Sequence, residues 1–161
     1  MKIAGVYSFN DGENVVAKKH PGLLAEVNAV INAIDASKCK SKESEEKTMP
    51  GRLLFSPRAL NDCFKIEFSK FRDWKSVRVP CDYPSKFYRG GYTSRATGRN
   101  AFREMDFVKD ELGIEVQFGK YAFMVYNVCA KMTIFKNLGH IKTGIEIVPV
   151  KAFADEMSTG V

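Results

Sequence analysis

The chain has 161 residues, of which 45% are hydrophobic and 12 are phenylalanine, so we expect one domain with a sizeable core. Its formal net charge of +6 and its pI of about 9.1 favour a polyanionic partner or an acidic surface. The 4 cysteines are widely spaced without a CxxC pair and only 2 histidines are present, which argues against a zinc site and favours reduced core thiols.

The N-terminal part predicts a short strand and a helix. Met1–Asn10 contains no long apolar stretch, and no later segment approaches the roughly 20 apolar residues that span a bilayer, so we expect a soluble, cytoplasmic protein without a signal peptide. Lys2–Phe9 alternates loosely, which favours a short strand. Apolar residues at helical spacing then indicate a helix that ends near Asp35 and belongs to the core or to a dimer interface: Leu23, Leu24, Val27, Val30, Ile31 and Ile34.

Two charged features accompany this helix. Glu26 lies on it and is either solvated, as most helix acids are, or close to a metal site. Residues 38–50 mix both signs of charge without an apolar face, so we expect a mobile loop there.

The middle of the chain predicts a second helix and then a cationic loop. Ser56 is a candidate N-cap and Pro57 suits the first helical position. An apolar stripe follows at Leu60, Phe64, Phe68 and Phe71, and Trp74 closes this helix against the core. Residues 83–103 carry Lys86, Arg89, Arg95, Arg99 and Arg103 among glycine and tyrosine. This segment is either a contact to nucleic-acid phosphates or an ordinary exposed loop, and its residues leave both interpretations open.

The most informative stretch is DFVKDELGIEVQFGK, residues 106–120, which predicts a hairpin of two strands. If Asp110 and Glu111 form a two-residue loop, residues whose numbers add to 221 face each other, and Asp106 lies opposite Glu115. Two carboxylates placed in this way repel each other. A Mg²⁺ ion offsets such repulsion, because it binds one or two carboxylates and keeps waters and phosphate oxygens as its other ligands.

The other residues of the second strand support this interpretation. Gln117 points to the same face as Glu115 and can position a water or a phosphate oxygen without adding charge. The alternate residues face a core: Ile114, Val116 and Phe118. This arrangement is expected of a metal-dependent phosphodiesterase, whereas the alternative is an acidic hairpin on a solvated surface.

The C-terminal part adds a helix and a strand. Apolar spacing from Tyr121 to Phe135 predicts a helix that Asn137–Gly139 ends, and Gly144–Val150 predicts a strand with its proline at an edge or terminus. The order helix, hairpin, helix, strand predicts an α/β (α+β) fold, in which a mixed central β-sheet is flanked by helices and residues 1–161 form a single domain.

The run MDFVKDELGIEVQFGKYAFMVYN, residues 105–127, resembles the BglII and BstYI group of type II restriction endonucleases, a branch of the PD-(D/E)xK nuclease fold. In that group glutamine replaces the usual last lysine of the motif, as Gln117 does here. LLFSPRALNDCF at residues 53–64 and GIEIVPVKAF with MSTGV near the end agree more loosely. The family continues beyond the last of these segments, so we expect the sequence to be either a piece of a longer chain that lacks a C-terminal portion or a naturally short member.

The resemblance implies a restriction-endonuclease-like core that cleaves double-stranded DNA with Mg²⁺ and no organic cofactor. The expected catalytic residues are Asp106, Glu115 and Gln117. The two acids hold the metal, and the Val116 carbonyl completes the protein ligands. The group acts as homodimers on short palindromes, some of them centred on GATC, and we expect the same here.

DNA contacts are expected from both the basic loop and the resemblance. Lys120 corresponds to a base-contacting position of the family, although a phosphate contact is the alternative. Ser158 and Thr159 correspond to a loop that reads bases, and Arg95 and Arg99 are candidates for phosphate contacts.

Two further functions remain open at this stage. Because Gln117 lacks the charge of the common motif, the protein is alternatively a DNA-binding module that does not cut. It is also alternatively a nuclease of the same fold that acts in repair or junction resolution.

Overall fold

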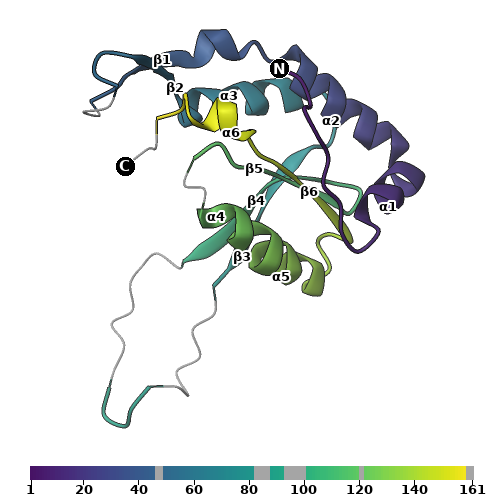
Figure 1. Cartoon of the computed structure of the whole chain (residues 1–161). Coiled ribbons are helices and arrows are strands. Elements are labelled where there is room, and N and C mark those ends of the chain that lie inside the picture. The colour runs from purple at the N-terminus through teal and green to yellow at the C-terminus, as the bar shows by residue number, and fades with distance from the viewer. Residues whose placement is uncertain (46–48, 82–87, 93–100, 120–121, 159–161) are drawn as a thin grey trace.

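The computed structural model describes residues 1–45, 49–81, 88–92, 101–119 and 122–158, and its centre is a mixed β-sheet between two layers of helices (Figure 1). The elements follow in the order α1 (Gly12–Lys19), α2 (Pro21–Ala33), η1 (Ala36–Cys39), β1 (Lys40–Glu43), β2 (Leu53–Phe55), α3 (Pro57–Phe68), β3 (Lys75–Pro80), β4 (Phe102–Lys109), β5 (Leu112–Val116), α4 (Ala122–Tyr126), η3 (Asn127–Lys131), α5 (Met132–Asn137), β6 (Thr143–Ile147) and α6 (Lys151–Ala154). Here η1 is a 3-10 helix and η3 is a π-helical segment.

The four central strands lie in the order β3-β4-β5-β6. β4 is antiparallel to both of its neighbours, whereas β5 and β6 are parallel. A parallel pair needs a crossover connection, and the segment from α4 to α5 provides it. The predicted mixed sheet with flanking helices is confirmed.

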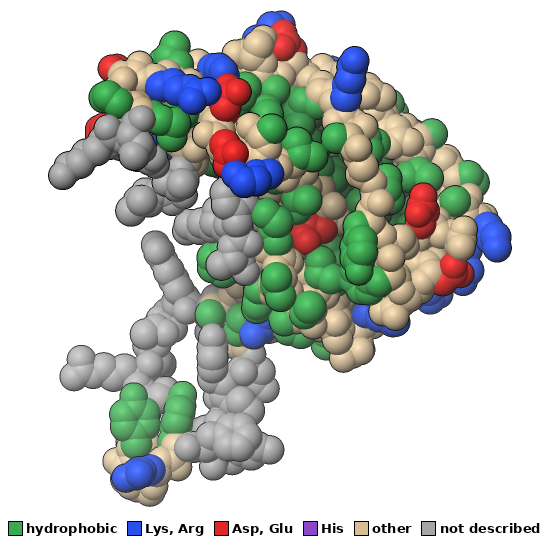
Figure 2. All heavy atoms as spheres, viewed as in Figure 1, with side chains coloured by type: hydrophobic (Ala, Val, Ile, Leu, Met, Phe, Trp, Pro, Cys, Tyr) green, Lys and Arg blue, Asp and Glu red, His purple; other side chains and the backbone are tan. Residues whose placement is uncertain are grey.

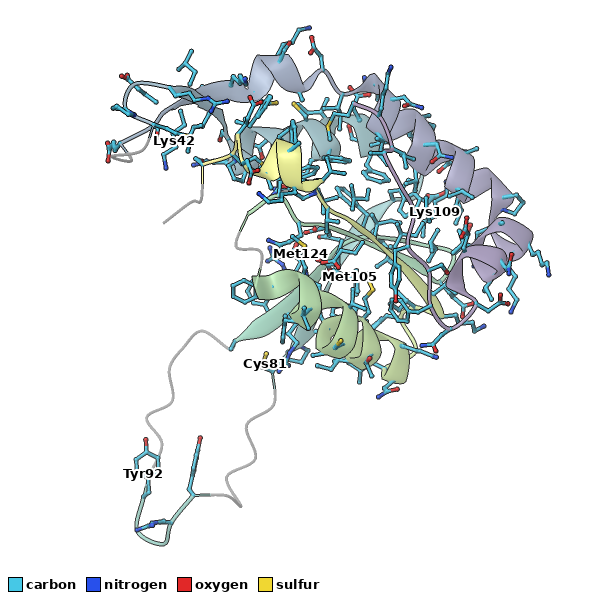
Figure 3. All side chains as sticks on the ribbon, viewed as in Figure 1. Lys42, Cys81, Tyr92, Met105, Lys109 and Met124 are labelled. Carbon is cyan, nitrogen blue, oxygen red and sulfur yellow. The ribbon has the colours of Figure 1, made fainter. Side chains whose placement is uncertain are left out.

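Residue alternation along β5 separates the two faces of the sheet. Ile114 and Val116 belong to a core beneath α2 and α3, with Val30, Phe64 and Phe68 among its other members. The opposite face is covered by the helical layer from α4 to α5, where Phe135 packs with Met105, Val108 and Ile141. Figure 1 shows the two helical layers on opposite sides of the strands, and Figure 3 shows Met105 between β4 and the second layer.

Two glycines let the second helical layer approach the sheet closely. Gly113 and Gly144 are direct neighbours on β5 and β6. A Cβ atom at Gly144 would lie 2.6 Å from the Met132 sulfur, and one at Gly113 would lie 3.0 Å from a methyl carbon of Ile141. The absence of side chains here therefore brings the start of α5, and with it Lys131, down onto the face that carries Glu115.

The β4–β5 hairpin has the predicted turn and register. Asp110 and Glu111 both have positive φ angles, 46° and 64°, as a two-residue type I′ turn requires. The paired residues are Phe107 with Ile114, Val108 with Gly113, and Lys109 with Leu112, so the predicted pairing rule holds.

A β-bulge in β4 lies at the position of the first motif acid. The pairing with β3 passes from Lys75–Val108 to Val77–Met105, so β4 contains one residue more than β3 across this step. The extra residue falls at Asp106 and Phe107. Because a bulge changes the direction of a side chain and is common beside active sites, it accounts for the departure of Asp106 from the regular alternation.

The predicted helices are found with small changes. α2 buries Leu23, Val27, Val30 and Ile31 in the core. Of the two predicted uses of its apolar face, the structure therefore shows packing in the core. Ser56 caps α3 by accepting a hydrogen bond from the Ala59 amide at 3.3 Å, and Trp74 packs against Phe68 with the ring centroids 5.1 Å apart. Of the helix predicted from Tyr121 to Phe135, Tyr121 lies outside the described residues, and the rest is a helical stretch interrupted by the π-helical η3.

The N-terminal strand predicted at Lys2–Phe9 is wrong. The described residues 1–9 contain no strand, and Val6 and Tyr7 are 68% and 89% exposed. Loose alternation over so few residues does not suffice, because a strand also needs a partner along a sheet edge.

Conversely, residues 40–43 of the predicted loop 38–50 form the exposed strand β1, which pairs through its backbone with β2. Within the described ranges, no helix is both long and apolar enough to cross a membrane.

Candidate active site

The two motif acids lie where β4 and β5 part. The regular ladder reaches Phe107 and Ile114, and the next residues are Asp106 and Glu115. The Asp106 side chain takes over the bonding at this point, because its Oδ2 accepts a hydrogen bond from the Val116 amide at 2.9 Å. The two carboxylates are close enough for the charge of Asp106 to raise the pKa of Glu115. The two acids therefore lie close together as predicted. The Asp106 side chain replaces the next backbone hydrogen bond between the two strands.

Glu115 is a buried acid with an asymmetric environment. The residue is 2% exposed. Its Oε2 accepts a hydrogen bond from the Lys131 Nζ at 2.6 Å, while its Oε1 is buried and has no hydrogen-bond partner among the described residues. Burial is the largest cause that raises its pKa to about 7, Asp106 adds to the rise, and Lys131 opposes it. A buried carboxylate oxygen without a partner is costly, and this atom can bind a cation without giving up a hydrogen bond within the protein.

Asp106 shares this environment to a smaller extent. Burial raises the pKa of its carboxyl group, whereas the hydrogen bond from Val116 and the charge of Lys131 lower it. Lys131 therefore acts electrostatically on both acids. Figure 2 shows the surface under which this region lies, with the helical layer of α4 and α5 toward the viewer.

Gln117 is held in a second polar group on the same face. Its Oε1 accepts a hydrogen bond from the Asn127 Nδ2 at 3.1 Å, and its Nε2 donates to the Gly119 carbonyl. Asn127 is 3% exposed and also donates to the Glu146 Oε1 at 3.2 Å. Glu146 is the parallel neighbour of Glu115 on β6, and burial raises the pKa of its carboxyl group. Three neighbouring strands thus each place one carboxylate near Lys131.

The residues fit a hard divalent cation, although not a closed protein cage. Among the residues that the structure describes, no group of three or more His, Cys, Asp or Glu side chains could hold a metal ion. Mg²⁺ does not require one, because it binds through one or two carboxylates and keeps several waters. The partnerless Glu115 Oε1 and the neighbouring Asp106 carboxylate supply such ligands. In a strand the N–H and C=O of one residue point to the same side, so the Val116 carbonyl points toward Asp106, as its amide does.

The predicted DNA-contacting residues fall mostly outside the described residues: Lys120, Thr159, Arg95 and Arg99. Ser158 is described and is 5% exposed, with its amide bonded to the Phe55 carbonyl at 3.0 Å. Its role in base reading therefore stays a prediction, and in this structure the residue is not at the surface.

Glu26 follows neither of the two alternatives offered for it. The carboxylate accepts hydrogen bonds from the Trp74 Nε1 at 2.7 Å and from the Lys109 Nζ at 2.8 Å. Its side chain is 25% exposed. It is thus an ion-pair partner that joins α2 to the turn end of β4, where Figure 3 labels Lys109. The expectation of a solvated acid is wrong because the hairpin brings a cation to it.

Lys131, Asn127 and Glu146 were missed from the sequence. In an unbroken α-helix, Lys131 would lie at the edge of the apolar stripe of residues 121–135, three residues after Val128 and four before Phe135, from where a lysine usually extends to solvent. The π-helical segment changes the register of the helix at this place, and such segments are frequent at functional sites. The one available signal was the spacing of Asn127 and Lys131, four residues apart, which puts both on one side of a helix.

Comparison with known proteins identifies the family. The family model for the restriction endonucleases BglII and BglIII matches residues 4–161. Among solved structures, restriction endonuclease BglII complexed with a DNA 16-mer matches with a TM-score of 0.58 and 20% identity, over 91% of this chain and 64% of that chain. This likeness shows a common fold, and the present chain spans less than two thirds of that protein. No curated protein matches. Because the family model covers nearly the whole sequence, this protein belongs to the BglII/BglIII restriction endonuclease family, as the resemblance of residues 105–127 predicted.

Proposed function

We propose that the protein is a cytoplasmic, Mg²⁺-dependent type II restriction endonuclease that hydrolyses both strands of DNA at a short palindrome. The observation that carries the proposal is the pair of carboxylates where β4 and β5 diverge, the buried one of Glu115 and the half-buried one of Asp106. One oxygen of each is fixed by a protein donor, Val116 N–H for Asp106 and Lys131 for Glu115. A prearranged pair of this kind is suited to electrostatic catalysis, since little reorganisation is needed during the reaction.

The division of roles follows from the donors and acceptors present. Asp106, Glu115 and the Val116 carbonyl would hold Mg²⁺, which when bound polarises the phosphate and lowers the pKa of a coordinated water. Gln117 carries no charge, so its role is to donate to a phosphate oxygen, or to position a water through either its amide N–H or its amide oxygen. Asn127 keeps Gln117 in place for this by binding its Oε1. The buried setting strengthens each of these interactions, because water competes less for the same groups.

Cationic residues near Asp106 support approach of a DNA backbone. An open hollow of about 390 Å³ beside Asp106 is lined by Lys65, Lys75 and Arg78, among others. Arg78 also pairs with Glu104 at 2.9 Å. Phosphate neutralisation dominates the affinity of proteins for DNA.

The outlying predicted residues complete the proposed interface. We assign phosphate contacts to Arg95 and Arg99, and base contacts to Lys120, Ser158 and Thr159, the last three from the resemblance to the family. Ser158 has to become accessible on DNA for this role, since the residue is buried here.

A palindromic target requires two chains, because a two-fold axis relates the two scissile phosphates. We propose that α4 and the start of β4 form the homodimer face. Phe123 and Val125 on α4 are 48% and 69% exposed, and Phe102 on β4 is 52% exposed. Arg103 joins the two elements by donating to the Tyr126 hydroxyl at 3.2 Å. Figure 2 shows hydrophobic side chains gathered in this region, as is common at protein–protein interfaces. If this face forms the dimer, light scattering of the free protein should give the mass of two chains.

The decisive experiment is incubation of supercoiled plasmid with the protein, with and without Mg²⁺. We expect discrete linear fragments only with Mg²⁺, and none from Asp106→Ala. Asp155→Ala is the matched control, because Asp155 is an exposed acid that pairs with Lys151 on α6. Sequencing the fragment ends would give the target, which we expect to be centred on GATC.

Other products would contradict the proposal in distinguishable ways. A gel shift of plasmid without any cutting would identify a DNA-binding module instead. Cutting confined to branched substrates would identify a repair or junction nuclease of the same fold. Discrete bands from a protein that remains monomeric on DNA would retain the nuclease and remove the dimer.

A further inference from the structure

The site brings together more carboxyl groups than its motif can balance. Asp106, Glu115 and Glu146 lie on three neighbouring strands, Glu115 is 2% exposed, and Glu146 is its direct neighbour on β6. The common form of the motif would place a lysine at position 117, on the same face. Gln117 offers hydrogen bonds but no charge, so a cation must come from elsewhere in the fold.

Lys131 occupies the position from which such a cation would act. Its Nζ lies 2.6 Å from Glu115 Oε2, and its side chain is only 14% exposed. Its charge also lowers the pKa of Asp106 and of Glu146. A lysine that is 14% exposed and acts on three acids at once differs from an exposed pair such as Lys151 with Asp155, in which both side chains are more than half exposed.

We propose that Lys131 is the resident cation of the catalytic acids and supplies from the helical layer the positive charge that Gln117 lacks on β5. Its catalytic consequence rests on the proposed nuclease function. Lys131 is a positioning residue, because it acts through Glu115. It holds Oε2 and leaves Oε1 without a protein partner, so the carboxylate is oriented and still has one oxygen to offer.

The π-helical segment explains how the residue reaches this position. Asn127 begins the segment and Lys131 ends it. Asn127 binds Gln117 and Glu146, while Lys131 binds Glu115, so one stretch of five residues contacts polar groups on both β5 and β6. The glycine pair Gly113 and Gly144 keeps this stretch close to the strands.

The proposal predicts that the charge can be moved between the two elements. Lys131→Met keeps most of the bulk of the side chain and removes its charge. Gln117→Lys in that background returns a charge to the same face of β5, two residues from Glu115. Lys136→Met is the matched control, because it removes an exposed cation from the same helical layer.

The first measurement is thermal melting at pH 8 without Mg²⁺ or DNA. We expect Lys131→Met to lower the melting temperature by roughly 5 to 10 °C, since it leaves Glu115 buried and unpaired. Adding either Glu115→Gln or Gln117→Lys should recover at least half of that loss, and Lys136→Met should change it little. A Lys131→Met protein that melts within about 1 °C of the wild type, or a loss that neither second substitution recovers, would overturn the proposal.

The second measurement is single-turnover cleavage with Mg²⁺, together with DNA affinity without it. We expect Lys131→Met to slow cleavage by about 100-fold with nearly unchanged affinity, and Gln117→Lys to restore at least about tenfold of that loss. If melting recovers and cleavage does not, Lys131 is only a structural partner and the proposal fails. If the wild type does not cleave at all, the proposed function fails instead. The melting temperatures then decide the role of Lys131: recovery by Gln117→Lys supports it, and no recovery overturns it.

Discussion

The two faces of β5 differ in what they bury and in how their residues are stabilised. The face toward α2 and α3 buries Ile114 and Val116 in an apolar core. The face toward the α4–α5 layer buries Glu115, at 2% exposure, against Lys131, and it also carries Gln117, which Asn127 binds. Alternation along β5 thus places the core residues on one face and the candidate catalytic residues on the other. The catalytic face is the one on which burial of a charge is electrostatically unfavourable.

This difference explains why the polar face needs several elements and the apolar face needs few. Apolar burial is non-directional, so many side chains of suitable size fill the core equally well. A buried carboxylate instead needs a partner at a defined atom and distance, such as Lys131 Nζ at 2.6 Å from Glu115 Oε2. Substitutions on the polar face should therefore alter activity more than stability, and those on the apolar face should do the opposite.

The largest expected effect is that of Glu115→Gln on cleavage. The substitution keeps the shape of the side chain and removes a proposed metal-binding carboxylate, so single-turnover cleavage should fall by at least about 1,000-fold. The fold should be retained, because the amide oxygen of glutamine can still accept the hydrogen bond from Lys131. Circular dichroism and a plasmid assay measure the two effects. Retention of cleavage within tenfold would show that the polar face does not carry the reaction.

The second effect should be the reverse on the apolar face. Ile114 is fully buried, and Ile114→Ala should lower the free energy of unfolding by about 3 kcal/mol by leaving a cavity. Denaturant titration measures this loss, and cleavage at a temperature where the variant is folded should remain within a few-fold of the wild type. A large drop in cleavage by fully folded protein would mean that the two faces are not separate in function.

The sequence is informative about the hairpin because its rules are local. The turn at Asp110 and Glu111 fixes the register, and alternation then decides which residues of β5 share a face. The pairing of Asp106 with Glu115 follows from these two rules within ten residues. The same holds for α3, whose cap and apolar stripe are both continuous in the chain.

The partners of the acids could not be predicted in the same way. Lys131 is 16 residues from Glu115, and Asn127 is 19 residues from Glu146. These contacts depend on how the helical layer sits on the sheet, which the π-helical η3 and the close approach at Gly144 decide. The bulge at Asp106 also depends on tertiary structure, since it arises only when β3 pairs with β4. β3 itself was not predicted.

A pH titration sharpens the comparison by isolating Glu115. Its pKa is raised from 4.5 to about 7 in the folded, metal-free protein. Because the folded pKa of this acid is the higher one, its stabilising contribution is complete below the unfolded value and is lost as the pH rises through about 7. The stability of the wild type relative to Glu115→Gln should therefore fall by roughly 3 kcal/mol between pH 4.5 and pH 8.

Added Mg²⁺ provides the control for that titration. An ion that binds the ionised acids should restore stability at pH 8 and do little at pH 5, where a proton occupies Glu115. Urea unfolding at the two pH values measures both effects. A stability difference that does not change between these pH values would mean that Lys131 keeps Glu115 ionised throughout.

The smallest effect, and the most specific one, concerns Gln117. Gln117→Ala removes a neutral side chain that binds Asn127, so neither the charge of the site nor the apolar core changes. Cleavage should slow by about 10- to 100-fold, as for loss of one positioned hydrogen-bonding group, while DNA affinity stays within about twofold. Asn127→Ala should reproduce part of the loss, because Gln117 then keeps its bond to Gly119 but loses the one to Oε1. If Gln117→Ala instead weakens DNA binding, the residue contacts DNA in the ground state. The polar face would then be a recognition surface as well as a catalytic one, since alternation along β5 assigns Gln117 and Glu115 to the same side.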